Sequence, residues 1–333
     1  MISFRSILCS LLLLAANTAV AQEEQTEQGN TSQSQLVIVM GAEGEPEFGE
    51  QFNRWVDQWE SVAKTAGVQH TTIGRSTVDG QDDRESLRAT IASLQPNGVR
   101  PVWIVLIGHG TFTRQAAKFN LRGPDVSAKE LAEWIQPIER PLVVINCSSS
   151  SGPFINQLSG KNRIVVTATK SGSQYNYARF GAYFANAITS LDSDLDHDDE
   201  ISVHEAFLRA SADVRNFYNA EARINTEHAL IDDNGDKRGT PATMFRGVRA
   251  IGQAKDGKSL DGKQANRVTL APTKKRLPLT DDEVSQREQL EQELEGLRDK
   301  KADMSESEYD QAIEPILIQL AKIYAAAEKR NQK

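Results

Sequence analysis

The stretch Val102–Gly110 (VWIVLIGHG) contains six consecutive apolar residues and ends in Gly108-His109-Gly110. An apolar run of this length that ends at glycine is typical of a strand buried on both faces of a parallel sheet. A second run of this kind, Leu142–Ile145, leads through Asn146 to Cys147. Functional loops of such sheets follow the carboxyl ends of the strands, so we expect His109 and Cys147 to lie at the same edge.

Strand and helix patterns alternate on both sides of these two runs. Further apolar runs predict strands at 36–40, 68–73 and 163–167. Apolar residues at helical spacing predict helices at 48–66, 83–94, 179–189 and 203–224, and another that begins after Ser127. This alternation predicts an α/β fold with a mostly parallel central sheet flanked by helices. We place this domain at residues 36–250.

The N-terminal residues 1–21 have the features of a cleaved export signal. A basic residue, Arg5, precedes an apolar stretch at 7–16, and Ala19-Val20-Ala21 forms an A-x-A cleavage site. The apolar stretch is shorter than the roughly 20 residues of a spanning helix, although an uncleaved anchor is the alternative. We expect an exported protein, periplasmic or secreted, with no membrane span after signal cleavage. The polar residues 22–35 predict a disordered tether.

The C-terminal part of the chain predicts a linker followed by two helices. Residues 251–279 are rich in glycine, lysine and aspartate and show little periodicity, which is typical of a linker. Thr280 with Glu283, and Ser305 with Glu308, are capping boxes that predict a helical hairpin at 280–330. The hairpin could be a packing appendage or a site for a protein partner.

Composition restricts the class of partner. Lys and Arg number 38 against 46 Asp and Glu, so the formal net charge is −8. An acidic chain of this kind argues against nucleic acid as a partner and is compatible with cation binding. Hydrophobic residues make up 39% of the chain, which is enough for a sizeable core.

Cys147 is the only cysteine that remains after signal cleavage, because Cys9 lies in the signal. In an exported protein such a thiol is a free reactive group, an intermolecular bridge or an incidental residue. A thiolate is a strong nucleophile, and a neighbouring imidazole can accept and return its proton. Backbone N–H groups of a glycine-rich turn can stabilise an oxyanion. The pattern therefore predicts a Cys-His dyad, although each residue alone is more often a small core residue or part of a turn.

A strand that ends in His-Gly, followed by a strand that ends in Cys, resembles the legumain/caspase-like (clan CD) superfamily of cysteine peptidases. Residues 167–172 and 179–184 are also similar to segments that follow the nucleophile in bacterial legumain-type members. The resemblance covers roughly residues 36–245 and implies a caspase-like sandwich that hydrolyses peptide bonds in peptide or protein substrates. It makes Cys147 the nucleophile and His109 the base and acid, and it makes the N–H groups of Gly110 and Cys147 the oxyanion hole. It also implies that the hairpin at 280–330 could be a self-inhibitory segment that covers the active site.

The sequence also departs from the superfamily around the cysteine. The caspase signature Gln-Ala-Cys-x-Gly is absent, since Asn146 precedes Cys147 and serines occupy 148–151. No residue can be assigned to reading the substrate side chain. The alternative is therefore a catalytically inactive, peptidase-like, calcium-binding interaction protein.

Residues 194–205 match the loop of an EF-hand, which predicts Ca²⁺ as a structural or activating ion. We expect no organic cofactor. The pattern supplies short carboxylates, a backbone carbonyl at the seventh position and a glutamate at the twelfth, from Asp194, Asp196, Asp198, Glu200 and Glu205. Asp199 stands where glycine is usual, which weakens the match. The alternative is an acidic helix N-terminus favoured by the helix dipole. A second acidic turn at 232–236 lacks the twelfth-position glutamate and is interpreted as an Asx/Gly turn.

Overall fold

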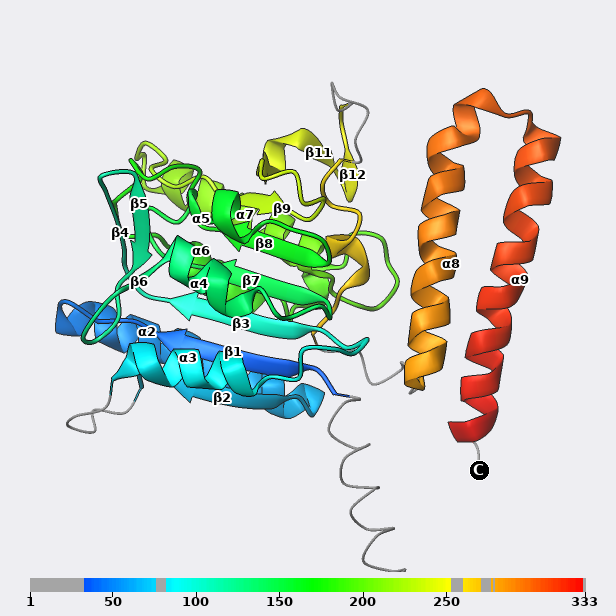
Figure 1. Ribbon diagram of the computed structural model, residues 1–333. Coiled ribbons are helices and arrows are strands. Elements are labelled where there is room, and N and C mark those ends of the chain that lie inside the picture. Colours follow the sequence, from blue (N-terminus) through cyan, green and yellow to red (C-terminus); the bar gives the residue numbers. More distant parts are fainter. Residues whose placement is uncertain (1–32, 76–81, 253–259, 271–276, 278, 332–333) are drawn as a thin grey trace, which may run out of the picture.

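The structure is a computed structural model that describes residues 33–75, 82–252, 260–270, 277 and 279–331. The predicted export signal and nearly all of the predicted tether lie outside the described residues. Within the described part, the central feature is a seven-stranded sheet in the order β10-β9-β8-β7-β3-β1-β2 (Figure 1). Its strands are β1 (Gln35–Met40), β2 (Gln69–Ile73), β3 (Val102–Ile107), β7 (Leu142–Asn146), β8 (Arg163–Thr167), β9 (Leu230–Asp232) and β10 (Thr240–Pro241).

The sheet is mostly parallel, as the alternating pattern predicts. β2, β1, β3, β7 and β8 run in the same direction, whereas β9 is antiparallel to β8 and β10 is antiparallel to β9. Parallel neighbours need crossover connections, and the helices between the strands supply them. The predicted α/β class is confirmed.

Helices cover both faces of the sheet. One face packs against α2 (Pro46–Ala66), α6 (Phe180–Ala187) and α7 (Val203–Ala220), and the other packs against α3 (Asp83–Ser93), α4 (Ala128–Ile135) and α5 (Phe154–Leu158). Residues alternate between the two sides along each strand, so Trp103, Val105 and Ile107 face α2 and α6 whereas Ile104 and Leu106 face the opposite layer.

Several short elements were not predicted from the sequence. A three-stranded antiparallel sheet of β4 (Gly110–Thr113), β5 (Ala116–Phe119) and β6 (Val126–Ser127) follows the carboxyl end of β3. The strands β11 (Phe245–Arg246) and β12 (Arg249–Ala250) form a separate pair. The described 3₁₀ turns are η1 (Leu191–Ser193), η2 (Ala242–Met244), η3 (Ala265–Arg267) and η4 (Lys301–Asp303).

The predicted C-terminal hairpin is present as α8 (Asp281–Lys300) and α9 (Glu306–Asn331). Arg100, which precedes β3, donates a hydrogen bond to the Leu279 carbonyl at 2.7 Å, and Arg267 pairs with Glu295 at 2.6 Å. The hairpin therefore lies beside the amino edge of the sheet, and the arrows of the parallel strands β1, β3, β7 and β8 in Figure 1 point away from it. Because His109 and Cys147 follow the opposite edge, the hairpin does not cover them, and the expected self-inhibition by covering has no support.

Part of the predicted linker is packed rather than free. Ala265 and Leu270 are buried in the main core, and Ser202 forms an isolated β-bridge with Thr269. Residues 260–270 therefore pack against the amino edge of the sheet and precede the hairpin in the sequence. Among the described helices, none combines the length and the apolar character needed to cross a membrane.

Candidate functional site

The register of the sheet brings the ends of β3 and β7 together. Leu106 pairs with Asn146, and the Cys147 N–H continues the ladder by donating to the Leu106 carbonyl at 2.9 Å. His109 follows β3 two residues after Ile107, and its ring lies against Phe48 and Phe52 of the α2 side. Cys147 belongs to the core cluster on that same side. The two residues therefore follow neighbouring strands on the same face of the sheet.

The Cys147 side chain is enclosed by the core. It is 1% exposed, and a methyl group added at Gly181 of α6 would lie 2.7 Å from its Cβ and 2.8 Å from the Trp55 ring. Among the described residues its sulfur has no hydrogen-bond partner. Burial raises the pKa of this thiol to about 12, so at neutral pH it is protonated and a poor nucleophile.

The His109 ring contacts aromatic side chains and a backbone carbonyl. Within the described residues, no hydrogen bond joins it to Cys147. Its Nε2 lies 3.2 Å from the Glu43 carbonyl, and its ring centroid lies 5.0 Å from that of Phe48 and 6.3 Å from that of Tyr177. A carbonyl only accepts, so this contact requires the proton on Nε2 and leaves Nδ1 as the basic nitrogen of the neutral ring. Burial lowers the His109 pKa, which favours that neutral form.

The two N–H groups expected to form an oxyanion hole both have partners within the protein. Cys147 N–H donates to the Leu106 carbonyl at 2.9 Å, and Gly110 N–H donates to the Ser149 hydroxyl at 3.3 Å. In this conformation neither N–H is directed at a vacant position beside the thiol. The oxyanion hole stays a prediction that would require both hydrogen bonds to be exchanged.

The serine run at 148–151 forms a buried hydrogen-bond network, which was not predicted from the sequence. The Ser148 hydroxyl donates to Asn146 Oδ1 at 2.6 Å, and the Ser149 hydroxyl donates to the Gly110 carbonyl at 3.1 Å. The Ser150 hydroxyl reaches the Gly172 carbonyl at 3.0 Å, and the Ser151 hydroxyl lies 3.2 Å from that of Thr169. All four serines are at most 4% exposed. Four successive hydroxyls after a buried strand were the available signal for such a network.

The acidic turn at 232–236 is also held in place by hydrogen bonds. The Asp233 carboxylate accepts hydrogen bonds from Gly262 N–H at 2.9 Å and Ala265 N–H at 2.7 Å. In return, Asp261 accepts from the N–H groups of Asp233 and Asn234. These reciprocal bonds tie the turn to residues 261–265. Within the turn, Asp236 N–H donates to Asn234 Oδ1 at 2.8 Å, which is the hydrogen bond of an Asx turn.

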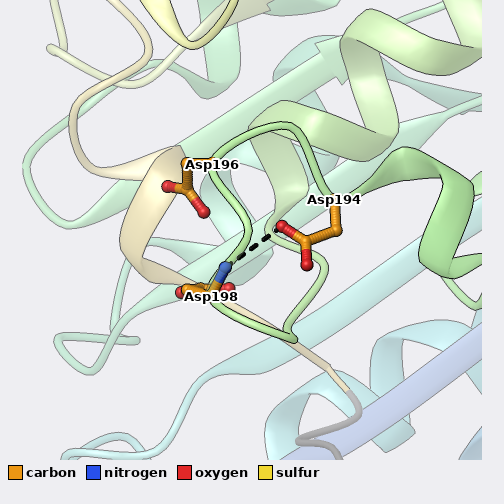
Figure 2. Close-up of side chains that lie close together, drawn as sticks. All are labelled: Asp194, Asp196 and Asp198. Atoms are coloured by element: carbon orange, nitrogen blue, oxygen red, sulfur yellow. Dashed lines mark hydrogen bonds between the residues drawn. The ribbon is translucent and has the colours of Figure 1, made fainter.

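The predicted calcium loop brings three carboxylates together, as Figure 2 shows. Oxygens of Asp194, Asp196 and Asp198 lie within 4.8 Å of one another. Oxygens that share one Ca²⁺ at about 2.3–2.6 Å can be separated by up to about 5 Å, so this spacing fits the ion. Asp194 also accepts from the N–H groups of His197, Asp198 and Asp199, at 2.6, 3.2 and 3.0 Å. Asp199 has φ of 67°, the left-handed conformation for which glycine is usual at this position.

The two glutamates of the loop differ in placement. The Glu205 carboxylate points into the loop, where it accepts from Leu195 N–H at 2.7 Å and from Ser202 N–H at 2.9 Å. It would exchange some of these bonds on binding an ion. Glu200 lines a cavity of about 500 Å³, which is also lined by Asp196 and Asp198 of the loop and by Arg287 and Tyr324 of the hairpin. Burial raises the pKa of Glu200 to about 7. The seventh position of an EF-hand loop is filled by a backbone carbonyl, so the Glu200 side chain is not needed as a ligand.

The loop lies at the amino edge of the sheet, opposite His109 and Cys147. α6 leads the chain back from the carboxyl edge, and the bridge between Ser202 and Thr269 joins the loop to the segment that precedes the hairpin. An ion at this position would hold the connection between α6 and α7 without touching the predicted dyad. The arrangement favours a structural role for the ion over direct activation.

A search of protein-family models and a search of curated proteins each found no match. Among solved structures, the chain is similar to the Drosophila initiator caspase Dronc, with a TM-score of 0.44 and 13% identity over 63% of this chain and 83% of that chain. It is also similar to caspase-1 from Spodoptera frugiperda, with a TM-score of 0.39 and 10% identity over 61% of this chain and 87% of that chain. Both neighbours are caspases; the legumain subtype stays a prediction.

Proposed function

We propose that this protein is an exported calcium-binding protein built on a caspase-like α/β fold, in which Cys147 is a core residue and not a nucleophile. The observation that carries the calcium site is the convergence of the Asp194, Asp196 and Asp198 carboxylates on one loop. The enclosure of the Cys147 thiol supports the non-catalytic part of the proposal. Export rests on residues 1–21 of the sequence.

The loop residues divide the work of binding between them. Asp194, Asp196 and Asp198 would supply side-chain oxygens, Glu200 a backbone carbonyl, and Glu205 a carboxylate at the start of α7. Calcium supplies positive charge that offsets the mutual repulsion of these carboxylates. Asp194 additionally keeps the turn closed through its three N–H bonds. The side chains hold the turn in position before the ion arrives.

Calorimetry with the mature chain tests the calcium site. We expect one Ca²⁺ to bind with Kd between about 10⁻⁶ and 10⁻³ M, the range of EF-hand sensors and weaker modules. Asp196→Asn should weaken binding at least tenfold, because within the described part of the chain the Asp196 carboxylate accepts no hydrogen bond and serves mainly as a candidate ligand. Asp192→Asn is the control, since it removes a charge that is also exposed and lies just outside the loop.

Two results would contradict the site. Absence of binding heat at millimolar Ca²⁺ is the first. The second is equal weakening by Asp196→Asn and Asp192→Asn, which would indicate attraction to general negative charge and not coordination by the loop.

A second candidate function is an exported cysteine endopeptidase that uses the His109–Cys147 dyad on a peptide substrate. It is favoured by the placement of both residues after neighbouring parallel strands on one face of the sheet. In that case the carboxyl edge would have to open, so that the thiol transfers its proton to the imidazole and attacks a peptide carbonyl. The N–H groups of Gly110 and Cys147 would then leave Ser149 and Leu106 to bind the oxyanion.

Thiol labelling separates the two candidates. If Cys147 is a core residue, iodoacetamide should alkylate the folded chain at pH 7.5 at least 100-fold more slowly than the same chain in denaturant. His109→Ala should leave that rate unchanged. Rapid labelling that falls in His109→Ala, together with peptide-library turnover that Cys147→Ala abolishes, would instead establish the peptidase.

A further inference from the structure

One face of α9 in the C-terminal hairpin has apolar side chains that the described chain leaves uncovered. α9 packs on α8 through Ile316, Ile323 and Ala327. On a different side of the helix, Leu317 is 47% exposed and Ile318 is 46% exposed. Ala321, one turn further along, is exposed as well. Large apolar residues that lie side by side on an exposed helix face are typical of an interaction site.

An acidic row continues this face toward the start of α9. Glu306, Asp310 and Glu314 recur at every fourth residue and lie on the same open surface of α9 as Leu317 and Ile318. No lysine or arginine lies on this surface. Within the described part of the chain, none of the three carboxylates forms an ion pair. Like charges at this spacing repel one another, so positive charge from a partner would stabilise the row.

We propose that this face of α9 binds a basic amphipathic helix of another protein. The apolar stripe of the partner would cover Leu317, Ile318 and Ala321, and its lysine or arginine side chains would pair with Glu306, Asp310 and Glu314. A second copy of this chain fits less well because its formal charge is −8. An anionic lipid surface is repelled by the same acidic row. The proposal goes beyond calcium binding and does not rest on it.

A synthetic 18-residue helix of leucine and lysine, patterned to be amphipathic and labelled with fluorescein, is a suitable probe. Fluorescence anisotropy with the full mature chain at 150 mM salt should show binding. A glutamate-for-lysine version and a version with the same composition but without helical spacing should each bind at least tenfold more weakly. The double variant Leu317→Ser/Ile318→Ser should weaken binding of the lysine helix at least tenfold without a change in net charge.

Ile224→Ser is the matched control, because Ile224 is an 87% exposed isoleucine far from α9 in the sequence. It should leave the affinity within twofold, and circular dichroism should show that all variants melt as the wild type does. Equal binding of the patterned and unpatterned lysine peptides would overturn the proposal. So would unchanged affinity in the double variant. Sedimentation that finds a wild-type dimer and a monomeric double variant would assign the face to self-association instead.

Discussion

The Ser149 hydroxyl joins two strand-end loops by bonding both backbone groups of Gly110. It accepts from Gly110 N–H at 3.3 Å and donates to the Gly110 carbonyl at 3.1 Å. A methyl group added at Gly110 would lie 2.2 Å from the Ser149 carbonyl oxygen, so only glycine fits this contact. The residue that follows His109 is thus fixed to the loop that follows Cys147. This contact supports an interpretation of the carboxyl edge as closed.

Ser149→Ala should lower the free energy of unfolding by about 1–3 kcal/mol, because it leaves a buried N–H and a buried carbonyl without a partner. Ser173→Ala, at an exposed serine of the neighbouring loop, should change it by less than about 0.5 kcal/mol. Urea unfolding of both variants provides the comparison. Equal effects in the two variants would contradict the stabilising role of the Ser149 hydrogen bonds.

His204 predicts a dependence of stability on pH. Its side chain is fully buried, neither ring nitrogen has a hydrogen-bond partner by geometry within the described residues, and its ring lies 4.5 Å from that of Phe245. Burial lowers its pKa to about 4, while the nearby Asn266 amide opposes the shift. Between pH 6.5 and 4 the unfolded chain binds a proton that the folded chain rejects, so stability falls as the pH falls through this window.

The loss of folding stability that is due to His204 should reach about 3 kcal/mol at pH 4. His204→Phe keeps a ring beside Phe245 and removes the titrating group, so its loss of stability on acidification should be smaller than that of the wild type. Urea unfolding at pH 7.0 and pH 4.5 measures this difference. If wild type and variant lose equal stability between the two values, His204 does not titrate as described.

Among the elements, α6 approaches the end of β7 so closely that its first turn requires glycine. A methyl group at Gly181 would meet Cys147 Cβ at 2.7 Å and the Trp55 ring at 2.8 Å. Gly296 in α8 is the opposite case, since nothing lies within 4 Å of the same position. The two helical glycines therefore differ only in what surrounds them.

Alanine at these two positions should act with opposite sign. Gly181→Ala should destabilise the protein by about 1–3 kcal/mol or more through overpacking. Gly296→Ala should stabilise α8 by about 0.5–1 kcal/mol, because alanine loses less backbone entropy in a helix. Urea unfolding followed by circular dichroism tests both. Destabilisation by Gly296→Ala would show that α8 has a neighbour on that side.

The elements also show where sequence reasoning succeeds. The strands at Val102–Ile107 and Arg163–Thr167 were predicted with their observed bounds, because long apolar runs between turn residues allow few other arrangements. The sheet of β4, β5 and β6 was missed because Gly110–Thr113 has three exposed residues and no alternating pattern. Its pairing depends on the antiparallel partner Ala116–Phe119, which local sequence does not reveal.

The candidate site was predictable in position but not in environment. Apolar runs placed His109 and Cys147 at one edge, and the structure brings them to neighbouring strands. The direction of the thiol could be predicted from the sequence. Val143 and Ile145 of β7 and Cys147 directly after it are every second residue, so their side chains lie on the same face of the sheet, which faces the core. What the sequence does not contain is the packing of α6 on that face, which buries the sulfur.

At the scale of the whole molecule, the sheet separates two edges with different contents. The carboxyl edge holds His109, Cys147 and the buried serines, whereas the amino edge holds the acidic loop at 194–205 and the hairpin. Arg100, which precedes β3, and Arg267, in η3, attach the hairpin to the amino edge. Any influence of the hairpin on Cys147 would have to pass through the length of the sheet. Direct covering is therefore not available in this arrangement.

Removal of residues 271–333 should consequently leave the carboxyl edge unchanged. We expect Cys147 in the shortened chain to react with iodoacetamide at a rate within twofold of the full mature chain, with Cys147→Ala as the background. The melting temperature should fall, because Arg100 and Arg267 lose their partners and the apolar residues that face the hairpin become exposed. A labelling rate that rises tenfold or more in a shortened chain that is still folded, as judged by circular dichroism, would establish that the hairpin restrains the thiol from the opposite edge.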